Sequence, residues 1–320
     1  MTYFSVFVLT ILAEILYFHI AKKFNIIDKP NERSLHKQQT IRGGGIIFPI
    51  AAFIDFFYSE MLYPYFFVGL FLISLISFLD DIYTIPNRYR IIIQFLSVYL
   101  LLYDIAIYSQ IGFWIILLMI ILVGIINAYN FMDGINGITG GYSLISLLSL
   151  LYVNNYNTTF IDNDFIIFIS LGVLVFNFFN FRKQAKCFAG DIGSISVAFI
   201  IVFLLVKLIL LTNQYIYILF LSLYGIDTVY TLLVRIWQKE NIFEAHNKHF
   251  FQLLVQKCAF SHLQVSILYI VVQLIINSFI ILIVKSKQDT LGFSIIILIV
   301  LSCIYIYYRL KIIKTAITIK

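Results

Sequence analysis

Charged residues are scarce in this chain, and their scarcity excludes a soluble globular domain. Only 12% of its 320 residues are Asp, Glu, Lys or Arg, whereas 62% are hydrophobic. A typical soluble domain is about one quarter charged and about half apolar. We therefore predict a polytopic membrane protein rather than a large soluble core.

Cysteine is also rare, and its spacing excludes two further classes. Cys187, Cys258 and Cys303 form no CxxC pair, so neither a disulfide framework nor a zinc site is indicated. No internal repeat or low-complexity tract is visible. The first 21 residues lack a basic segment and a small-residue cleavage site, so we expect a membrane helix there and not a signal peptide.

Long apolar runs are what the chain does have. Crossing a bilayer takes about 20 apolar residues. Eleven candidate runs cover residues 2–21, 44–59, 61–79, 91–108, 111–127, 138–153, 164–181, 195–213, 215–234, 263–284 and 291–308. We expect one all-α domain over residues 1–320, a membrane helix bundle of about eleven transmembrane helices.

The Lys and Arg residues predict the orientation of this bundle. Placing the N-terminus outside puts 19 of the 22 basic residues in inner segments, and only Lys285 and Lys287 in outer ones. Because basic loops stay in the cytoplasm, we expect a cytoplasmic C-terminus. The same rule explains the net charge of +6, so we expect membrane lipid as a partner and no nucleic acid. The inner segments are 22–43, 80–90, 127–137, 182–194, 235–262 and 309–320.

Three acidic motifs lie at the ends of apolar runs. A carboxylate beside a membrane span is costly and usually marks a site. The predicted orientation puts all three motifs on the cytoplasmic side, where their carboxylates can share one metal ion with a phosphate. The motifs are Asp80-Asp81, Asn127-Ala-Tyr-Asn130-Phe-Met-Asp133-Gly134 and Gly190-Asp191-Ile-Gly193-Ser194.

Basic residues and glycines share that predicted face. Phosphoryl transfer depends on neutralising phosphate charge, and glycine lets backbone amides approach phosphate closely. Taken singly, each feature has a plain structural explanation; His246 and His249, for example, would face one side of a helix as a surface pair or a metal pair. Their co-occurrence favours a phosphate-handling centre. The basic set is Arg33, His36, Arg42, Arg88, Arg90, Lys183, Arg235, His246, Lys248 and His249.

Four stretches resemble the polyprenyl-phosphate N-acetylhexosamine-1-phosphate transferases, which form glycosyltransferase family 4. That family includes bacterial enzymes that initiate O-antigen and teichoic acid synthesis and, more distantly, the phospho-MurNAc-pentapeptide transferase of peptidoglycan. Asp227-Thr228 and Arg235 also fit its pattern. The four stretches are Asp28-Lys-Pro30-Asn31-Glu-Arg33-Ser-Leu-His36 with Arg42-Gly43-Gly44, Phe78-Leu-Asp80-Asp81, Asn127 to Gly137, and Gly190 to Ser194.

The resemblance implies a reaction and a location. A UDP-N-acetylamino sugar would donate its sugar 1-phosphate to undecaprenyl phosphate and release UMP, as the first step of a cell-surface polysaccharide. The cofactor would be Mg²⁺, with Mn²⁺ as a substitute. The enzyme would be a multi-pass protein of the bacterial inner membrane with its active site facing the cytoplasm; a homodimer is left open.

The resemblance also implies residue roles. Asp80, Asp81, Asp133 and Asp191 would be catalytic, and Asp191 and Asp80 would bind the metal. A phosphate monoester has its second pKa at about 6, so the acceptor needs little deprotonation at neutral pH. We therefore expect Asp80 or Asp81 to orient the reactants in a one-step displacement. The expected substrate-binding residues are Asn127, Asn130, Asn136, Arg33, His36, Arg42, Asp227, Arg235, His246, His249 and Gln252.

Two departures from the family pattern bear on the substrate. Many members have Asp where this chain has Asn136, in a loop implicated in holding uridine. The stretch His246-Asn-Lys-His249-Phe-Phe-Gln252 resembles transferases that use N-acetylated 6-deoxy sugars, so such a sugar is expected ahead of GlcNAc. The alternative function is a transporter of a nucleotide sugar or lipid-linked sugar, which would place its charges near mid-membrane. A CDP-alcohol phosphotransferase is disfavoured because its Asp-rich signature is not found.

Overall fold

Helices make up nearly all of the computed structural model, which describes residues 2–30, 38–106, 112–241, 246–286 and 289–318. A two-residue antiparallel ladder pairs Ile27 with Ile41 and Asp28 with Thr40. The elements are α1 (Tyr3–Lys23), β1 (Ile27–Asp28), β2 (Thr40–Ile41), η1 (Gly44–Ile46), α2 (Ile47–Tyr58), α3 (Pro64–Tyr83), α4 (Asn87–Asp104), α6 (Trp114–Phe131), α7 (Ile138–Tyr156), α8 (Asn163–Asn180), α9 (Gly190–Thr212), η2 (Tyr215–Leu221), α10 (Ser222–Trp237), α11 (Phe250–Cys258), α12 (His262–Lys285) and α13 (Thr290–Thr318).

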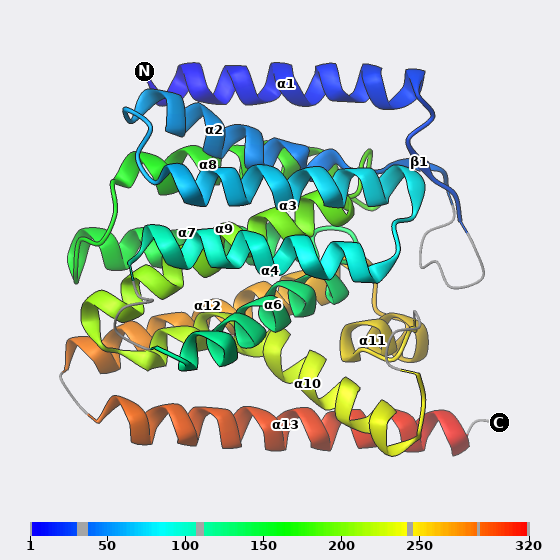
Figure 1. Ribbon diagram of the computed structural model, residues 1–320. Coiled ribbons are helices and arrows are strands. Elements are labelled where there is room, and N and C mark those ends of the chain that lie inside the picture. Colours follow the sequence, from blue (N-terminus) through cyan, green and yellow to red (C-terminus); the bar gives the residue numbers. More distant parts are fainter. Residues whose placement is uncertain (1, 31–37, 107–111, 242–245, 287–288, 319–320) are drawn as a thin grey trace.

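The long helices lie side by side and form one bundle (Figure 1). α1 and α13 lie at opposite edges of it, while α9 lies inside and packs against α2, α3, α6 and α7. The N-terminus is at the left end in Figure 1; β1, α11 and the C-terminus are at the right end. Successive helices run back and forth between these ends, so helix ends far apart in the sequence meet.

Aromatic packing holds α9 at the centre of the bundle. The rings of Phe199 and Phe203 stack on Phe66 of α3, with centroid distances of 5.4 and 4.1 Å. Lipid tails are as apolar as these rings, so helix association in a membrane depends on close packing more than on burial from water. An almost wholly apolar helix such as α9 is accordingly an interior helix.

Two glycines allow η1 to lie directly against the start of α9. A Cβ atom on Gly193 would lie 2.6 Å from the Cα of Gly45, which is closer than real Cβ atoms approach other atoms. This contact brings the turn before η1 next to Gly190, whose φ is +70°. The pair of glycines therefore positions the first turn of α9 beside the β2–η1 connection.

The predicted fold class, an all-α polytopic membrane bundle, is confirmed. Each of the eleven expected runs coincides with a helix, and eight helical segments of the described chain are long and apolar enough to cross a membrane. The other three, α2, α4 and α7, are shorter or more polar. Eleven crossings and their orientation stay predictions.

The expected helix boundaries need correction at the motifs. α3 extends to Tyr83 and α9 begins at Gly190, so Asp80, Asp81 and Asp191 lie in the end turns of helices and not in loops; α6 extends to Phe131, and Asp133 follows it in the α6–α7 connection. Apolar runs show where hydrocarbon ends, whereas a helix continues until its backbone hydrogen bonding is broken. The short helix α11 was not expected, because its nine residues form no membrane-length run.

Candidate active site

The three acidic motifs meet at one end of the bundle, the right end in Figure 1. Asp80 and Asp81 lie in the last turn of α3, Asp133 follows α6, and Asp191 lies in the first turn of α9. The β2–η1 connection adds Arg42. The alternating helix directions thus bring the three motifs to one end of the bundle, although Asp80 and Asp191 are 111 positions apart in the sequence. That this end faces the cytoplasm stays a prediction.

Arg90 joins two of the three motifs. From the first turn of α4, its Nη1 lies 2.6 Å from Asp80 Oδ2 and its Nη2 lies 2.8 Å from Asp191 Oδ2. A guanidinium presents donors in a fixed fork, so one side chain can hold two carboxylates in a defined relation. Arg90 therefore links α3, α4 and α9 at the site.

Asp81 accepts hydrogen bonds through both of its carboxylate oxygens. Its Oδ1 accepts hydrogen bonds from Arg42 Nε at 2.7 Å and from the backbone N–H of Asp191 at 2.9 Å, and its Oδ2 accepts from the N–H of Ile192 at 3.1 Å. These amides belong to the first turn of α9, where unpaired N–H groups favour an anion. Asp81 thus caps α9, and Arg42 also lies 3.7 Å from Asp191. Burial alone would lower the pKa of Arg42, but Asp81 and Asp191 raise it, so this guanidinium stays charged.

The α6–α7 connection supplies Asp133. Its Oδ1 accepts a hydrogen bond of 2.6 Å from the Thr139 hydroxyl. Removal from water, opposed by the hydrogen bond from Thr139 and helped by the charge of Asp81, raises the pKa of Asp133 to about 6. The carboxyl group is therefore mostly ionised at pH 7, and a modest fall in pH would protonate it.

The asparagines of this motif make structural contacts. Asn130 Oδ1 accepts from Ser194 on α9 at 2.7 Å, and Asn127 exchanges hydrogen bonds with Gln94 on α4. Asn136 donates to the backbone carbonyls of Arg182 and Lys183, at 2.8 and 3.2 Å. An aspartate could not donate these bonds, so Asn136 anchors the α8–α9 connection in a way that the common family residue could not.

A cavity of about 320 Å³ opens beside the carboxylates. Arg42, Asn130, Asp133, Asn136 and Asp191 line it, and so do residues that sequence reasoning missed. The missed residues are Asn180, Phe188 and His262; Phe188 could have been noticed from its place two positions before Gly190. A second cavity of about 430 Å³ shares Asn136, Phe188 and His262 with the first, so the two are contiguous.

The segment from His246 to Gln252 packs beside the Asp133–Gly134 turn of the site. A helical surface pair is the wrong description of His246 and His249, because His246 precedes α11 and His249 is its N-cap residue. Their rings are nevertheless 4.8 Å apart. Burial and the neighbouring His249 lower the pKa of His246 to about 4, so its ring is neutral at pH 7. Gln252 accepts a hydrogen bond from the backbone N–H of His249 at 3.1 Å.

Two other predicted substrate-binding residues, Asp227 and Arg235, are buried. Asp227 lies 3.3 Å from His249 Nδ1, so these two side chains face each other and not the cavity. Arg235 contacts Glu240 at 3.3 Å and the backbone carbonyl of Asn241. Asp227 thus holds His249 and the start of α11, and Arg235 holds Glu240 and Asn241. Arg33 and His36 lie outside the described residues.

Comparison with known proteins identifies the family of the central helices. Residues 63–209 match the model of the family described as "Glycosyl transferase family 4". The match spans α3 to α9 and contains Asp80, Asp81, Asp133 and Asp191. No curated protein matched the chain.

Proposed function

We propose, because the chain belongs to glycosyl transferase family 4, that it transfers an N-acetylamino-sugar 1-phosphate from a UDP-sugar to undecaprenyl phosphate. The products would be undecaprenyl-diphosphate-sugar and UMP. Family membership supports a membrane sugar-phosphate transferase in general. The donor, the acceptor and the location on the cytoplasmic side of a bacterial inner membrane are our proposal.

One observation carries this proposal: the carboxylate–guanidinium cluster beside a polar cavity. Asp80, Asp81 and Asp191 share Arg42 and Arg90, so carboxylates outnumber guanidinium groups even before Asp133 is counted. A net negative cavity would repel a diphosphate. A hard divalent cation would reverse this repulsion, as in other phosphoryl-transfer sites.

The donor atoms fit Mg²⁺, or Mn²⁺ in its place. Within the described parts of the chain, no three His, Cys, Asp or Glu side chains converge to form a complete cage. Mg²⁺ does not need one, because it takes one or two carboxylates together with water and phosphate oxygens. Asp191 and Asp80 would hold it. When bound, the ion would neutralise the donor diphosphate and polarise the phosphorus under attack.

The reaction is a displacement at the β-phosphorus of the donor. An oxygen of the acceptor phosphate forms a bond to this phosphorus while the bond to the bridging oxygen breaks, and UMP leaves with that oxygen. Arg42, whose side chain is 36% exposed and lines the cavity, would shift hydrogen bonds from carboxylate to phosphate. Asp133 and Asn136 would orient the nucleotide end of the donor.

A one-step displacement suits the environment of the aspartate pair. Both oxygens of Asp81 accept hydrogen bonds, from Arg42 and from two backbone amides. Asp80 accepts from the N–H of Ile85 through Oδ1 and pairs with Arg90 through Oδ2. A carboxylate whose oxygens are committed in this way is a poor nucleophile, so both residues would act by orienting their partners.

An apolar cavity nearby suits the isoprenoid tail of the acceptor. It measures about 400 Å³, and residues of α6, η2, α10 and α13 line it, among them Ala128, Tyr129 and Val229. Tyr129 precedes Asn130, which lines the polar cavity. A lipid phosphate could therefore reach the carboxylates while its tail stays among apolar side chains.

The donor sugar would be an N-acetylated 6-deoxy hexosamine, with GlcNAc second. The basis is the His246, His249 and Gln252 arrangement, and of these His246 is the half-buried one. A neutral imidazole can donate and accept one hydrogen bond each, which suits hydroxyl and amide groups of a sugar.

The test is an assay of purified protein with undecaprenyl phosphate, Mg²⁺ and a panel of UDP-amino sugars. We expect UMP release with one donor, loss of release with chelator, and no UMP burst from donor alone. Asp191→Asn should abolish turnover, whereas Asp289→Asn, an exposed carboxylate beside α13, should not. Absence of UMP release with every donor from folded protein would refute the proposal.

The transporter alternative receives no support from the site. Its charged residues would lie near mid-membrane, but Asp80, Asp133 and Asp191 lie at helix ends. In the same assay a transporter would move a UDP-sugar into vesicles without forming UMP.

A further inference from the structure

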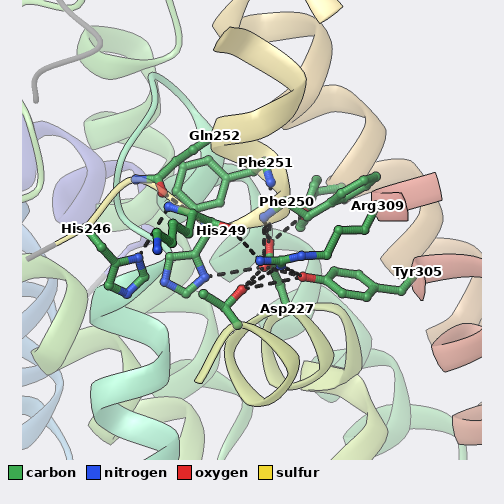
Figure 2. Close-up of polar contacts among 11 residues, drawn as sticks. Asp227, His246, His249, Phe250, Phe251, Gln252, Tyr305 and Arg309 are labelled. Atoms are coloured by element: carbon green, nitrogen blue, oxygen red, sulfur yellow. Dashed lines mark hydrogen bonds and ion pairs between the residues drawn. The ribbon is translucent and has the colours of Figure 1, made fainter. Parts of the chain in front are cut away.

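Asp227 is a buried carboxylate that the carboxylate–guanidinium cluster does not use. Its Oδ1 accepts from Phe250 N at 2.9 Å, from His249 Nδ1 at 3.3 Å and from Tyr305 Oη at 3.1 Å. Its Oδ2 accepts from Phe251 N at 3.4 Å and from Tyr269 Oη at 2.9 Å. Donors from α11, α12 and α13 thus converge on one side chain of α10 (Figure 2).

The geometry makes Asp227 a cap supplied to α11 from another helix. The first backbone N–H groups of a helix have no partner within that helix, and they favour a negative charge. The N-cap residue of α11 is His249, which leaves the amides of Phe250 and Phe251 to Asp227. Hydrogen bonds to an ionised acceptor are about twice as strong as neutral ones. Asp227 therefore fixes where α11 begins.

Arg309 contacts the same segment from the other side. This buried residue of α13 donates to the backbone carbonyl of Lys248 at 2.9 Å and to Thr231 Oγ1 at 2.8 Å, and it also contacts the Tyr305 hydroxyl. Asp227 holds amides after His249, whereas Arg309 holds a carbonyl before it. Together they clamp the start of α11 between α10 and α13.

The clamped segment packs behind one wall of the polar cavity. A Cβ atom on Gly134 would lie 2.9 Å from the ring of Phe251 and 3.7 Å from Gln252 Nε2, so α11 packs directly on this turn. Gly134 and the preceding Asp133 line the cavity. Displacement of α11 would therefore move both the Asp133 turn and His246.

We propose that Asp227 and Arg309 are positioning residues that hold α11 against the Asp133–Gly134 turn and thereby set how the donor sugar binds. This inference rests on the proposed function. It assigns a role to α13, which lies outside the family match at residues 63–209.

The experiment compares Tyr305→Phe and Arg309→Met with a matched control, Tyr307→Phe, which removes a hydroxyl from an exposed residue of the same helix. Loss of hydrogen bonds at the clamp should raise the KM for the UDP-sugar about tenfold and leave the KM for undecaprenyl phosphate unchanged. Arg309→Lys should recover part of the loss, because one ammonium can donate to Lys248 but cannot reproduce the guanidinium fork. A variant that is merely less stable would lower the active fraction and leave both KM values alone.

Hydrogen exchange separates this inference from the proposed reaction. In the full-length protein without substrate, the amides of Phe250 and Phe251 should exchange about tenfold faster in Tyr305→Phe and Arg309→Met than in Tyr307→Phe. If the wild type transfers no sugar phosphate but this exchange increases, the reaction is wrong and the clamp stands. Unchanged exchange of the Phe250 and Phe251 amides, or equal changes in the KM values for the UDP-sugar and for undecaprenyl phosphate, would refute the positioning role of Asp227 and Arg309.

Discussion

Asp133 is held differently from the other carboxylates of the site. Asp80, Asp81 and Asp191 pair with guanidinium groups, whereas the hydrogen bond described for Asp133 comes from the neutral hydroxyl of Thr139. Burial, with a smaller contribution from the charge of Asp81, raises the pKa of Asp133 to about 6. A group in this state costs the folded protein free energy whenever it is ionised.

This cost predicts a pH-dependent effect of Asp133→Asn. Because the pKa rises on folding from 3.8 to about 6, the folded protein loses stability as the pH increases through that interval. Asparagine keeps the acceptor for Thr139 but carries no charge. The variant should therefore melt about 3 °C above the wild type at pH 7.5 and close to it at pH 4. Thermal unfolding of detergent-solubilised protein at both pH values measures this, and an equal shift at the two would contradict the pKa.

The sequence could indicate which residues carry charge but not which partner each one has. Asp80, Asp133 and Asp191 stood out because they end apolar runs. Nothing in the spacing showed that Arg90 would bridge α3 and α9, or that Asn136 would donate to two carbonyls of the α8–α9 connection. Such pairings depend on how helices distant in the sequence pack.

At the scale of elements, hydropathy predicted the helices and missed their ends. A run of apolar residues is a direct consequence of lipid exposure, so each long helix was visible. α11 was not, because its first turn is stabilised by Asp227 of another helix and not by a sequence signal of membrane length. Elements that form by capping from elsewhere in the fold are the hardest to predict from sequence.

Close contact between η1 and α9 predicts a strong effect of Gly193→Ala. Its Cβ would lie 2.6 Å from the Cα of Gly45 and would separate the two elements, which moves Arg42 away from Asp81 and Asp191. We expect transferase activity to fall at least about tenfold, because misplacement of catalytic groups by about 1 Å costs far more than that. Gly124→Ala on α6 is the control, since nothing lies within 4 Å of its Cβ position. Equal activity in both variants, at equal protein level, would show that the contact does not position the site.

At the scale of the whole molecule, the site, α11 and the last turns of α13 share one end of the bundle (Figure 1). The Lys and Arg count predicts that this end is cytoplasmic, because the sequence segments expected on the inner side contain 19 of the 22 basic residues. Soluble nucleotide sugars would then have direct access to the cavity. The alternation of helices fixes which residues share an end but does not decide which end is inside.

Cysteine labelling decides the orientation. Cys258 is exposed at the end of α11 on the site side, Ser286 is exposed after α12 on the opposite side, and Cys187 is buried. In intact cells a membrane-impermeant maleimide should label Ser286→Cys in a Cys258→Ser, Cys303→Ser background. It should label Cys258 in a Cys303→Ser protein only after permeabilisation, because basic loops stay inside. The Cys258→Ser, Cys303→Ser protein retains only the buried Cys187, so it should stay unlabelled and serves as the control. The reverse labelling pattern would place the carboxylates outside, away from nucleotide sugars, and would remove the topological basis of the proposed reaction.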